Sequence, residues 1–330
     1  MIVKPRLQRV LLICSLLVNV AGLVFFALYL NVLGHLNSIA NERQQLASSL
    51  AYAQTSNVVT ELSALGKVDK RAFISHYDGN EDIFAVEPIA IPTKTRDVTL
   101  FVFLHGMGGT CAEPFEMPKN MPIANAILAK NHSYVVLSPN YRAPAGWASD
   151  AVISDITQNI RLMCQQYPVG HIYLIGSSMG GCVCLIYAAL APEEIKSKLE
   201  GVVSIEGAGD LTELYHKTAS DGVRAAMEQC FGGPPERVAM GYAAKIFLMP
   251  SNISAVPPKT RFAIISARQD KTVPPEFQDK LFKALTAQGR PVKLIPVEMD
   301  HGWPMLADVM QGIDFVMAQP PAPKEKPSEK

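Results

Sequence analysis

The sequence predicts a doubly wound α/β fold with a mostly parallel sheet, and three observations predict it. Short apolar runs alternate with amphipathic stretches of helical length along most of the chain. The links between them are short, so strands joined through helices are expected to lie parallel by right-handed crossovers. The run Val98–Leu104 is almost continuously apolar, which is typical of a strand buried on both faces.

The predicted elements follow one another in a regular order. The first two strands bracket the turn Asp78-Gly79-Asn80. The predicted strands span residues 72–77, 82–91, 98–104, 134–138, 171–175, 201–205, 261–266 and 292–297. The predicted helices span residues 122–130, 148–167, 179–191, 274–288 and 305–317. Residues 211–260 carry no strand pattern and are too many for a plain loop, so a small helical cap is expected there.

The N-terminal end departs from this pattern. Basic residues precede an apolar run at 10–33, and about twenty apolar residues suffice to cross a bilayer as a helix. The run is longer than the apolar part of a cleavable signal, and no clear small-residue cleavage site follows it. We therefore predict one transmembrane signal anchor, with a cleaved signal or a buried soluble helix as the alternatives. The flanking charges predict a cytoplasmic segment at 1–9 and a catalytic domain on the non-cytoplasmic side, periplasmic or extracellular.

Two further segments flank the predicted folded domain at 67–318. Residues 34–66 are polar, with apolar residues at loose helical spacing, which predicts a juxtamembrane helical stalk capable of weak self-association. Residues 319–330 are rich in proline and charge, so they are expected to form a disordered tail.

Composition argues against several classes of protein. The chain has 330 residues, with 30 basic and 30 acidic side chains, so no charge excess supports a nucleic-acid partner. Its 6 cysteines form no CxxC motif and no Cys/His cluster at zinc spacing, so neither a metal site nor a disulfide scaffold is indicated. Cys111 and Cys230 are candidates for a disulfide if the domain lies in an oxidising compartment.

The strongest motif is Gly176-Ser177-Ser178-Met179-Gly180-Gly181, directly after the apolar strand at 171–175 and before a helical segment. A G-x-S-x-G pattern in this strand–turn–helix context predicts a nucleophile elbow. The turn is so tight that the positions two residues either side of Ser178 must lack side chains. Ser178 is therefore the predicted nucleophile, and the alternative is a glycine-rich turn that serves packing alone.

A second glycine-rich motif, His105-Gly106-Met107-Gly108-Gly109, follows the buried strand at 98–104. Its glycines allow the backbone to approach a substrate, so Gly106 and Gly108 are predicted to bind it. The backbone N–H groups of Met107 and Met179 are predicted to form an oxyanion hole. His105 is expected to brace this loop rather than to act as a base.

The predicted base is His301, which follows the strand at 292–297 and precedes a helix. A serine hydroxyl needs a neighbouring imidazole to accept its proton. Asp270 follows the strand at 261–266 and is the predicted acid that orients His301. Glu206 and Asp210 follow the preceding strand and are the competing candidates for that acid.

The order Ser178, Asp270, His301, with H-G-x-G-G upstream, resembles the α/β-hydrolase superfamily over about residues 70 to 318. The segment Phe231-Gly232-Gly233-Pro234-Pro235-Glu236 is similar to prolyl-oligopeptidase-like and dienelactone-hydrolase-like members. The resemblance implies hydrolysis of a small-molecule ester, thioester or amide through an acyl-enzyme, with no cofactor. No β-propeller precedes the domain, and Met179 stands where those peptidases usually carry an aromatic residue, so an esterase is expected before a peptidase.

Three functional readings follow from the sequence. The first is a membrane-anchored carboxylic-ester hydrolase, and the second a peptidase or acyltransferase with the same catalytic residues. The third is a membrane-tethered scaffold without turnover. Trp303 is predicted to bind substrate, and aromatic side chains at Phe115, Tyr141 and Trp147 are candidates for lining an acyl pocket, with core packing as the alternative.

Overall fold

The computed structural model describes residues 60–62, 68–88, 95–119 and 121–318. Everything described belongs to one of the two units into which the chain divides, residues 55–330. The predicted cytoplasmic segment, signal anchor and tail lie outside the described residues, as does the predicted stalk apart from 60–62. Within the described ranges, no helix combines the length and apolarity that a membrane crossing requires.

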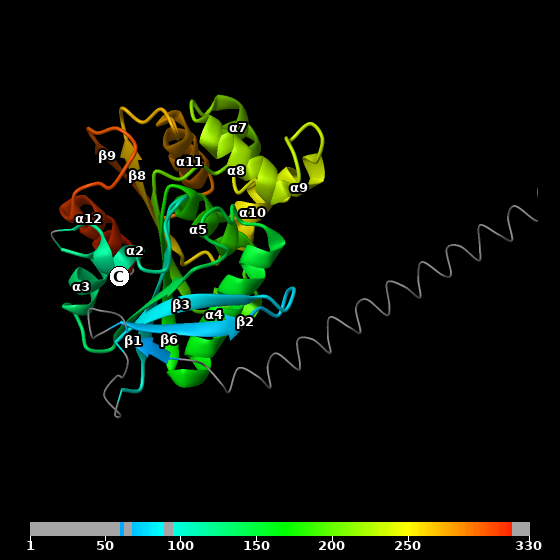
Figure 1. Ribbon diagram of the computed structural model, residues 1–330. Helices are drawn as coiled ribbons and strands as arrows, with labels where there is room; N and C mark the ends of the chain where they lie inside the picture. Colours follow the sequence, from blue (N-terminus) through cyan, green and yellow to red (C-terminus); the bar gives the residue numbers. More distant parts are fainter. Residues whose placement is uncertain (1–59, 63–67, 89–94, 120, 319–330) are drawn as a thin grey trace, which may run out of the picture. The chain divides into compact units, whose positions relative to one another are not determined.

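A nine-stranded sheet runs through the described part, in the order β1-β2-β3-β5-β4-β6-β7-β8-β9 (Figure 1). The pairs β1–β2, β2–β3 and β3–β5 are antiparallel, and all the others are parallel. This confirms the predicted mostly parallel, doubly wound sheet. The strands are β1 Thr60–Leu62, β2 Asp69–Ile74, β3 Glu81–Glu87, β4 Val98–Leu104, β5 Tyr134–Pro139, β6 Val169–Ser177, β7 Leu199–Ile205, β8 Arg261–Ala267 and β9 Val292–Val297.

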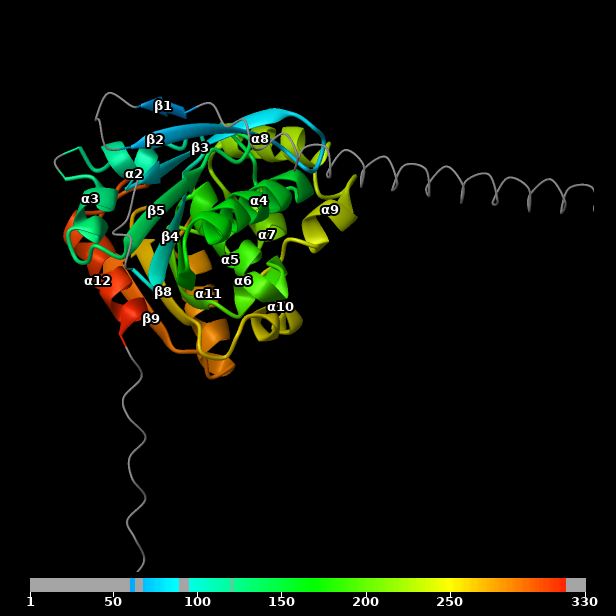
Figure 2. The same ribbon diagram turned by 90° about the horizontal axis from the view of Figure 1, so that it is seen from below.

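Helices cover both faces of this sheet, as Figures 1 and 2 show from two directions. One face packs against α3 Ile123–Leu128 and α12 Leu306–Met317. The other packs against α4 Asp150–Gln166, α5 Met179–Leu190 and α11 Glu276–Ala287. Because α5 is buried along nearly its whole length, it is apolar all round, whereas α4 and α11 keep polar outer faces.

The segment predicted as a helical cap, residues 211–260, contains four helices. They are α7 Leu211–Lys217, α8 Asp221–Phe231, α9 Ala239–Ala243 and α10 Pro250–Ala255. The side chains of Asp210 and Ser220 accept hydrogen bonds from backbone N–H groups in the first turns of α7 and α8, which fixes where these helices begin. The buried apolar residues of all four helices join the core on the α5 side of the sheet.

Three short elements differ from the sequence prediction. Residues 60–62 fall in the predicted helical stalk but form a strand, because their backbone pairs with β2, as in the register Glu61 with Lys70. The helices α2 Glu113–Glu116 and α6 Glu193–Lys196 were not expected. Four residues are too few to show a helical period in the sequence.

The candidate disulfide between Cys111 and Cys230 is wrong, since all the described cysteines are free. Cys111 belongs to the core on the α3 and α12 side of the sheet, whereas Cys230 packs against the core on the opposite side. The Cys230 thiol instead donates to the carbonyl oxygen of Gly146, at 3.1 Å. The sequence positions of Cys111 and Cys230 do not indicate on which face of the sheet each cysteine lies.

Candidate active site

Ser178 lies in the tight turn that joins β6 to α5. Its backbone has φ 53° and ψ −114°, a strained conformation for a residue other than glycine. A Cβ atom at Gly176 would lie 2.1 Å from the carbonyl oxygen of Gly180, and one at Gly180 would lie 2.0 Å from that of Leu104. The two glycines are therefore required by close backbone approach, as the motif predicts. The turn exposes the Ser178 side chain at the carboxyl end of the parallel strands.

His301 and Asp270 meet Ser178 at this edge of the sheet. The Oγ atom of Ser178 is 2.9 Å from Nε2 of His301, and Nδ1 of His301 is 2.6 Å from Oδ2 of Asp270. The three side chains follow β6, β8 and β9, whose carboxyl ends lie together because these strands are parallel. The structure thus brings together all three residues predicted to be catalytic.

The Asp270 carboxylate is fixed on both sides. Its Oδ1 atom accepts hydrogen bonds from the backbone N–H groups of Thr272, at 2.7 Å, and Val273, at 2.9 Å. Asp270 is buried, with only 3% of its surface exposed. Asp300, the neighbour of the histidine, accepts a hydrogen bond from the backbone N–H of His301 at 2.8 Å, whereas Asp270 accepts one from the imidazole ring.

A second carboxylate, from Glu206, also reaches the imidazole. Its Oε2 atom lies 3.1 Å from Nδ1 of His301, and it accepts a hydrogen bond from the N–H of Gly302 at 3.1 Å. Burial raises the pKa of Glu206 to about 7, and the charge of His301 and the hydrogen bond from Gly302 offset only part of that rise. The sequence presents Glu206 as a rival of Asp270, but the structure places both beside the same nitrogen.

The surroundings of His301 favour its charged form. Burial by itself would lower the pKa of His301, but the hydrogen bond to Asp270 and the negative charges of Glu206, Asp270 and Asp300 outweigh it, so the pKa is raised above 6.5. An imidazole that is stabilised as imidazolium is suited to accept a proton from a serine hydroxyl.

The loop at 105–109 packs against the elbow. A Cβ atom at Gly106 would lie 3.8 Å from Cβ of Ser178. The N–H groups of Gly106, Gly108 and Gly109 bond to Glu113, to the carbonyl of Pro144 and to the carbonyl of Gly106. Among the hydrogen bonds of the described residues, none engages the N–H of Met107 or of Met179. These two groups are free to bind a ligand oxygen beside Ser178.

Two buried side chains hold this loop. The ring nitrogens of His105 lie 2.8 Å from the carbonyl oxygen of Gly106 and 2.9 Å from that of Asn140, which fits the bracing role predicted for it. The Glu113 carboxylate accepts the N–H of Gly106 at 3.3 Å, and burial raises the pKa of Glu113 to about 7. Sequence reasoning missed Glu113, because α2 is too short to be recognised from its pattern.

The aromatic residues predicted to line an acyl pocket or to bind substrate lie in two different environments. Tyr141 and Trp147 are buried in the core on the α5 side, and Phe115 in the core on the opposite side, so none of the three is free to line an acyl pocket. Trp303 is partly exposed and stacks on Phe103 with ring centroids 5.9 Å apart. Trp303 therefore stays a candidate for substrate contact, together with Gly106 and Gly108.

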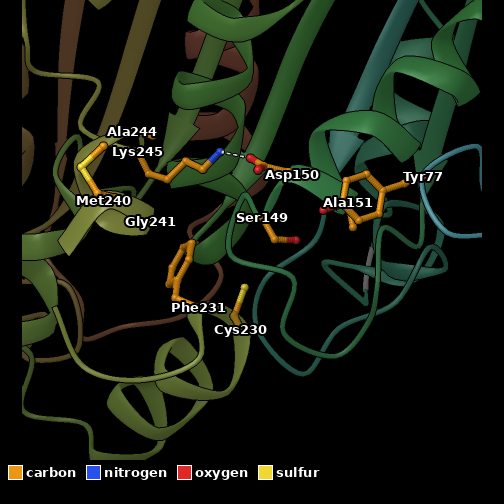
Figure 3. A pocket seen from close by; sticks show the side chains of 10 residues that line it. All are labelled: Tyr77, Ser149, Asp150, Ala151, Cys230, Phe231, Met240, Gly241, Ala244 and Lys245. Carbon is orange, nitrogen blue, oxygen red and sulfur yellow. Dashed lines mark hydrogen bonds and ion pairs between the residues drawn. The ribbon is translucent and has the colours of Figure 1, made fainter. Parts of the chain in front are cut away.

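A cavity of about 550 Å³ lies between the N-terminus of α4 and helices α8 and α9 (Figure 3). The ammonium group of Lys245 pairs with the Asp150 carboxylate there at 2.8 Å. Neither Ser178 nor His301 lines the cavity. Because the pair neutralises the charged groups of the cavity, its chemistry points to no particular ligand, and we assign it none.

The cluster of Glu206, Asp270 and His301 is explained by hydrogen bonding. One ligand-type atom from each lies within 4.8 Å of the others, a closeness that metal sites also show. The His301 Nδ1–H donates to Asp270, and the Gly302 N–H donates to Glu206, which accounts for the arrangement without a cation. That the chain uses no metal and no cofactor stays a prediction.

Comparison with known protein families agrees with this geometry. A family model described as alpha/beta hydrolase fold matches residues 99–213, which contain the loop at 105–109 and the elbow. No curated protein matches the sequence.

Solved structures with the same fold include peptidases and esterases. A puromycin-hydrolyzing peptidase of Mycobacterium tuberculosis has a TM-score of 0.59 and 16% identity over 74% of this chain and 38% of its own. An acylaminoacyl peptidase of Pyrococcus horikoshii has a TM-score of 0.57 and 15% identity over 76% of this chain and 40% of its own. An acetyl xylan esterase from Paenibacillus sp. R4 has a TM-score of 0.56 and 14% identity over 82% of this chain and 92% of its own. These likenesses confirm the predicted α/β-hydrolase fold, and the chain spans only about 40% of the peptidases' length.

Proposed function

Because the chain has the α/β-hydrolase fold, we propose that it is a serine hydrolase that cleaves a carboxylic ester or thioester through an acyl-enzyme. The observation that carries the proposal is the continuous link from Ser178 Oγ to His301 Nε2, at 2.9 Å, and from His301 Nδ1 to Asp270, at 2.6 Å. A base and an acid in this relation to a serine are what nucleophilic catalysis requires.

In the acylation step, Ser178 Oγ attacks the carbonyl carbon while its proton passes to Nε2 of His301. The imidazolium that forms is stabilised by Asp270, which keeps the remaining proton on Nδ1. The N–H groups of Met107 and Met179 bind the oxyanion, and each such donor contributes about 3 kcal/mol in the transition state. His301 then gives the proton to the leaving alcohol or thiol, and the ester bond to Ser178 is complete.

Deacylation repeats these steps with water in place of the alcohol. His301 takes a proton from the water, whose oxygen attacks the acyl carbon, and Ser178 leaves with that proton. The same two N–H groups hold the second oxyanion.

An ester is favoured over a peptide by the extent of the structural matches. The chain covers 92% of the acetyl xylan esterase but only 38% and 40% of the two peptidases. Most of each peptidase therefore has no counterpart in the aligned region. The matched domain of this chain thus corresponds to nearly the whole of an esterase, which supports an ester as the substrate.

The test is a panel of p-nitrophenyl esters of increasing acyl length beside a panel of aminoacyl p-nitroanilides, assayed with the full chain. We expect ester cleavage, with an initial burst of p-nitrophenol for the esters whose deacylation is slower than their acylation. A fluorophosphonate probe should label Ser178. Cleavage of the anilides alone would favour a peptidase, and neither cleavage nor labelling would favour a scaffold.

The hydrolase is further proposed to be held at a membrane by the apolar run at 10–33, with its catalytic domain on the non-cytoplasmic side. Alkaline phosphatase fused after residue 66 is expected to be active, since the enzyme folds only in an oxidising compartment. A matched fusion that lacks residues 1–33 should be inactive. An inactive first fusion, with the protein expressed, would contradict export.

A further inference from the structure

Glu206 is a buried carboxylate beside the imidazole that the reaction described above does not use. Only 1% of its surface is exposed. Its Oε2 atom lies 3.1 Å from His301 Nδ1, the nitrogen whose N–H donates to Asp270 at 2.6 Å. The hydrogen bond goes to Asp270, while Glu206 contacts the same nitrogen as an ion-pair partner.

The backbone around Glu206 is built to hold this carboxylate. Glu206 has φ 53°, a left-handed conformation that is unfavourable for a side chain with a Cβ atom. Its N–H donates to the carbonyl of Ile265 at 2.9 Å, which ties it to the end of β8. The next residue, Gly207, lies against the first turn of α5, where a Cβ atom would come 2.5 Å from the carbonyl carbon of Gly181. This packing holds the left-handed backbone of Glu206 in place. From that backbone the Glu206 side chain reaches Nδ1 of His301.

The charged groups that act on Glu206 all belong to the same cluster. They are His301, which favours its ionised form, and Asp270 and Asp300, which disfavour it. A bond from the Gly302 N–H also favours the ionised form. An ionised Glu206 can therefore accept the Nδ1–H after a small rotation of the imidazole if Asp270 is lost.

We propose that Glu206 is a positioning residue that supports Asp270, acting as a second acceptor for the His301 Nδ1–H and taking over that role when Asp270 is absent. This inference rests on the proposed serine hydrolase activity. Glu206 acts on the reaction by orienting His301, without contacting the substrate itself.

The experiment compares Glu206→Gln, Asp270→Ala and the double variant in the full chain, with kcat/KM for p-nitrophenyl acetate measured from pH 5 to 9. Glutamine keeps an acceptor for the Gly302 N–H but removes the charge. We expect Glu206→Gln to lower kcat/KM about 3-fold in the native background and at least about 10-fold in the Asp270→Ala background. The acidic limb of the Glu206→Gln profile should also move to lower pH, because a charge that raises the pKa of His301 is gone.

Asp300→Asn is the matched control, since it removes a nearby exposed charge that contacts the backbone of His301 but not its ring. Asp300→Asn should change kcat/KM by the same factor in the native and the Asp270→Ala backgrounds. Thermal melts confirm that each variant is folded. The proposal would be overturned if Glu206→Gln lowered kcat/KM by the same factor in both backgrounds and left the acidic limb of the pH profile unmoved. Glu206 would then serve only to bind the N–H of Gly302. If instead the native chain neither turns over esters nor reacts at Ser178 with a fluorophosphonate, the proposed function itself fails.

Discussion

Replacing Ser178 with alanine is expected to lower kcat for an ester by about 10⁴- to 10⁶-fold, because the hydroxyl that forms the acyl-enzyme is lost. The reason is geometric. Ser178 Oγ is the hydroxyl that bonds to His301 Nε2, at 2.9 Å, and the elbow exposes it at the sheet edge. Initial rates and fluorophosphonate labelling of the purified chain measure the effect.

Ser177→Ala is the matched control for this prediction. Ser177 is the adjacent residue of the same motif, but it lies at the end of β6 and is buried. Its variant should retain labelling and turnover within about 10-fold, since small buried changes mostly affect stability. If Ser178→Ala kept turnover comparable with that of Ser177→Ala, the assignment of the nucleophile would be refuted.

His301→Gln is expected to reduce kcat by a similar factor, about 10⁴- to 10⁶-fold, because the serine proton then has no acceptor. Glutamine is polar and close in size to histidine but cannot take a proton at neutral pH. The matched control is His216→Gln, an exposed histidine of α7 that lies 3.3 Å from Glu236. Activity in that control should be unchanged, and a loss in both variants would point to a general effect on folding.

The native enzyme should show a matching dependence on pH. Only the neutral imidazole can accept the proton, and the pKa of His301 is raised. Activity is therefore low below that pKa, rises as the pH passes through it, and is level above it. The midpoint of this rise in kcat/KM is expected above pH 6.5. A midpoint at or below the ordinary histidine value would mean that the negative charges around His301 do not act on it as the structure indicates.

The sequence already determines much of the fold and of the site. The alternation of apolar runs with helical periods predicts the parallel sheet. The spacing of apolar residues along a short stretch of chain indicates whether one or both faces of a strand or helix are buried. The elbow is equally local, since its glycines are required by backbone atoms within a few residues of Ser178 and in the adjoining strand. Parallel strands then bring His301 and Asp270 to the same edge.

Only the tertiary structure decided which side chains meet across long separations. Ser178 and His301 are 123 residues apart, and Glu206 and Gly302 are 96 apart, so their contacts depend on strand register and on the conformation of each loop. For the same reason the sequence left Glu206 and Asp270 as rivals, suggested a pairing of Cys111 with Cys230, and gave no sign that Glu113 binds the loop at 105–109. Periodicity reports which face of an element is buried, whereas the partner on that face is fixed only when the layers pack.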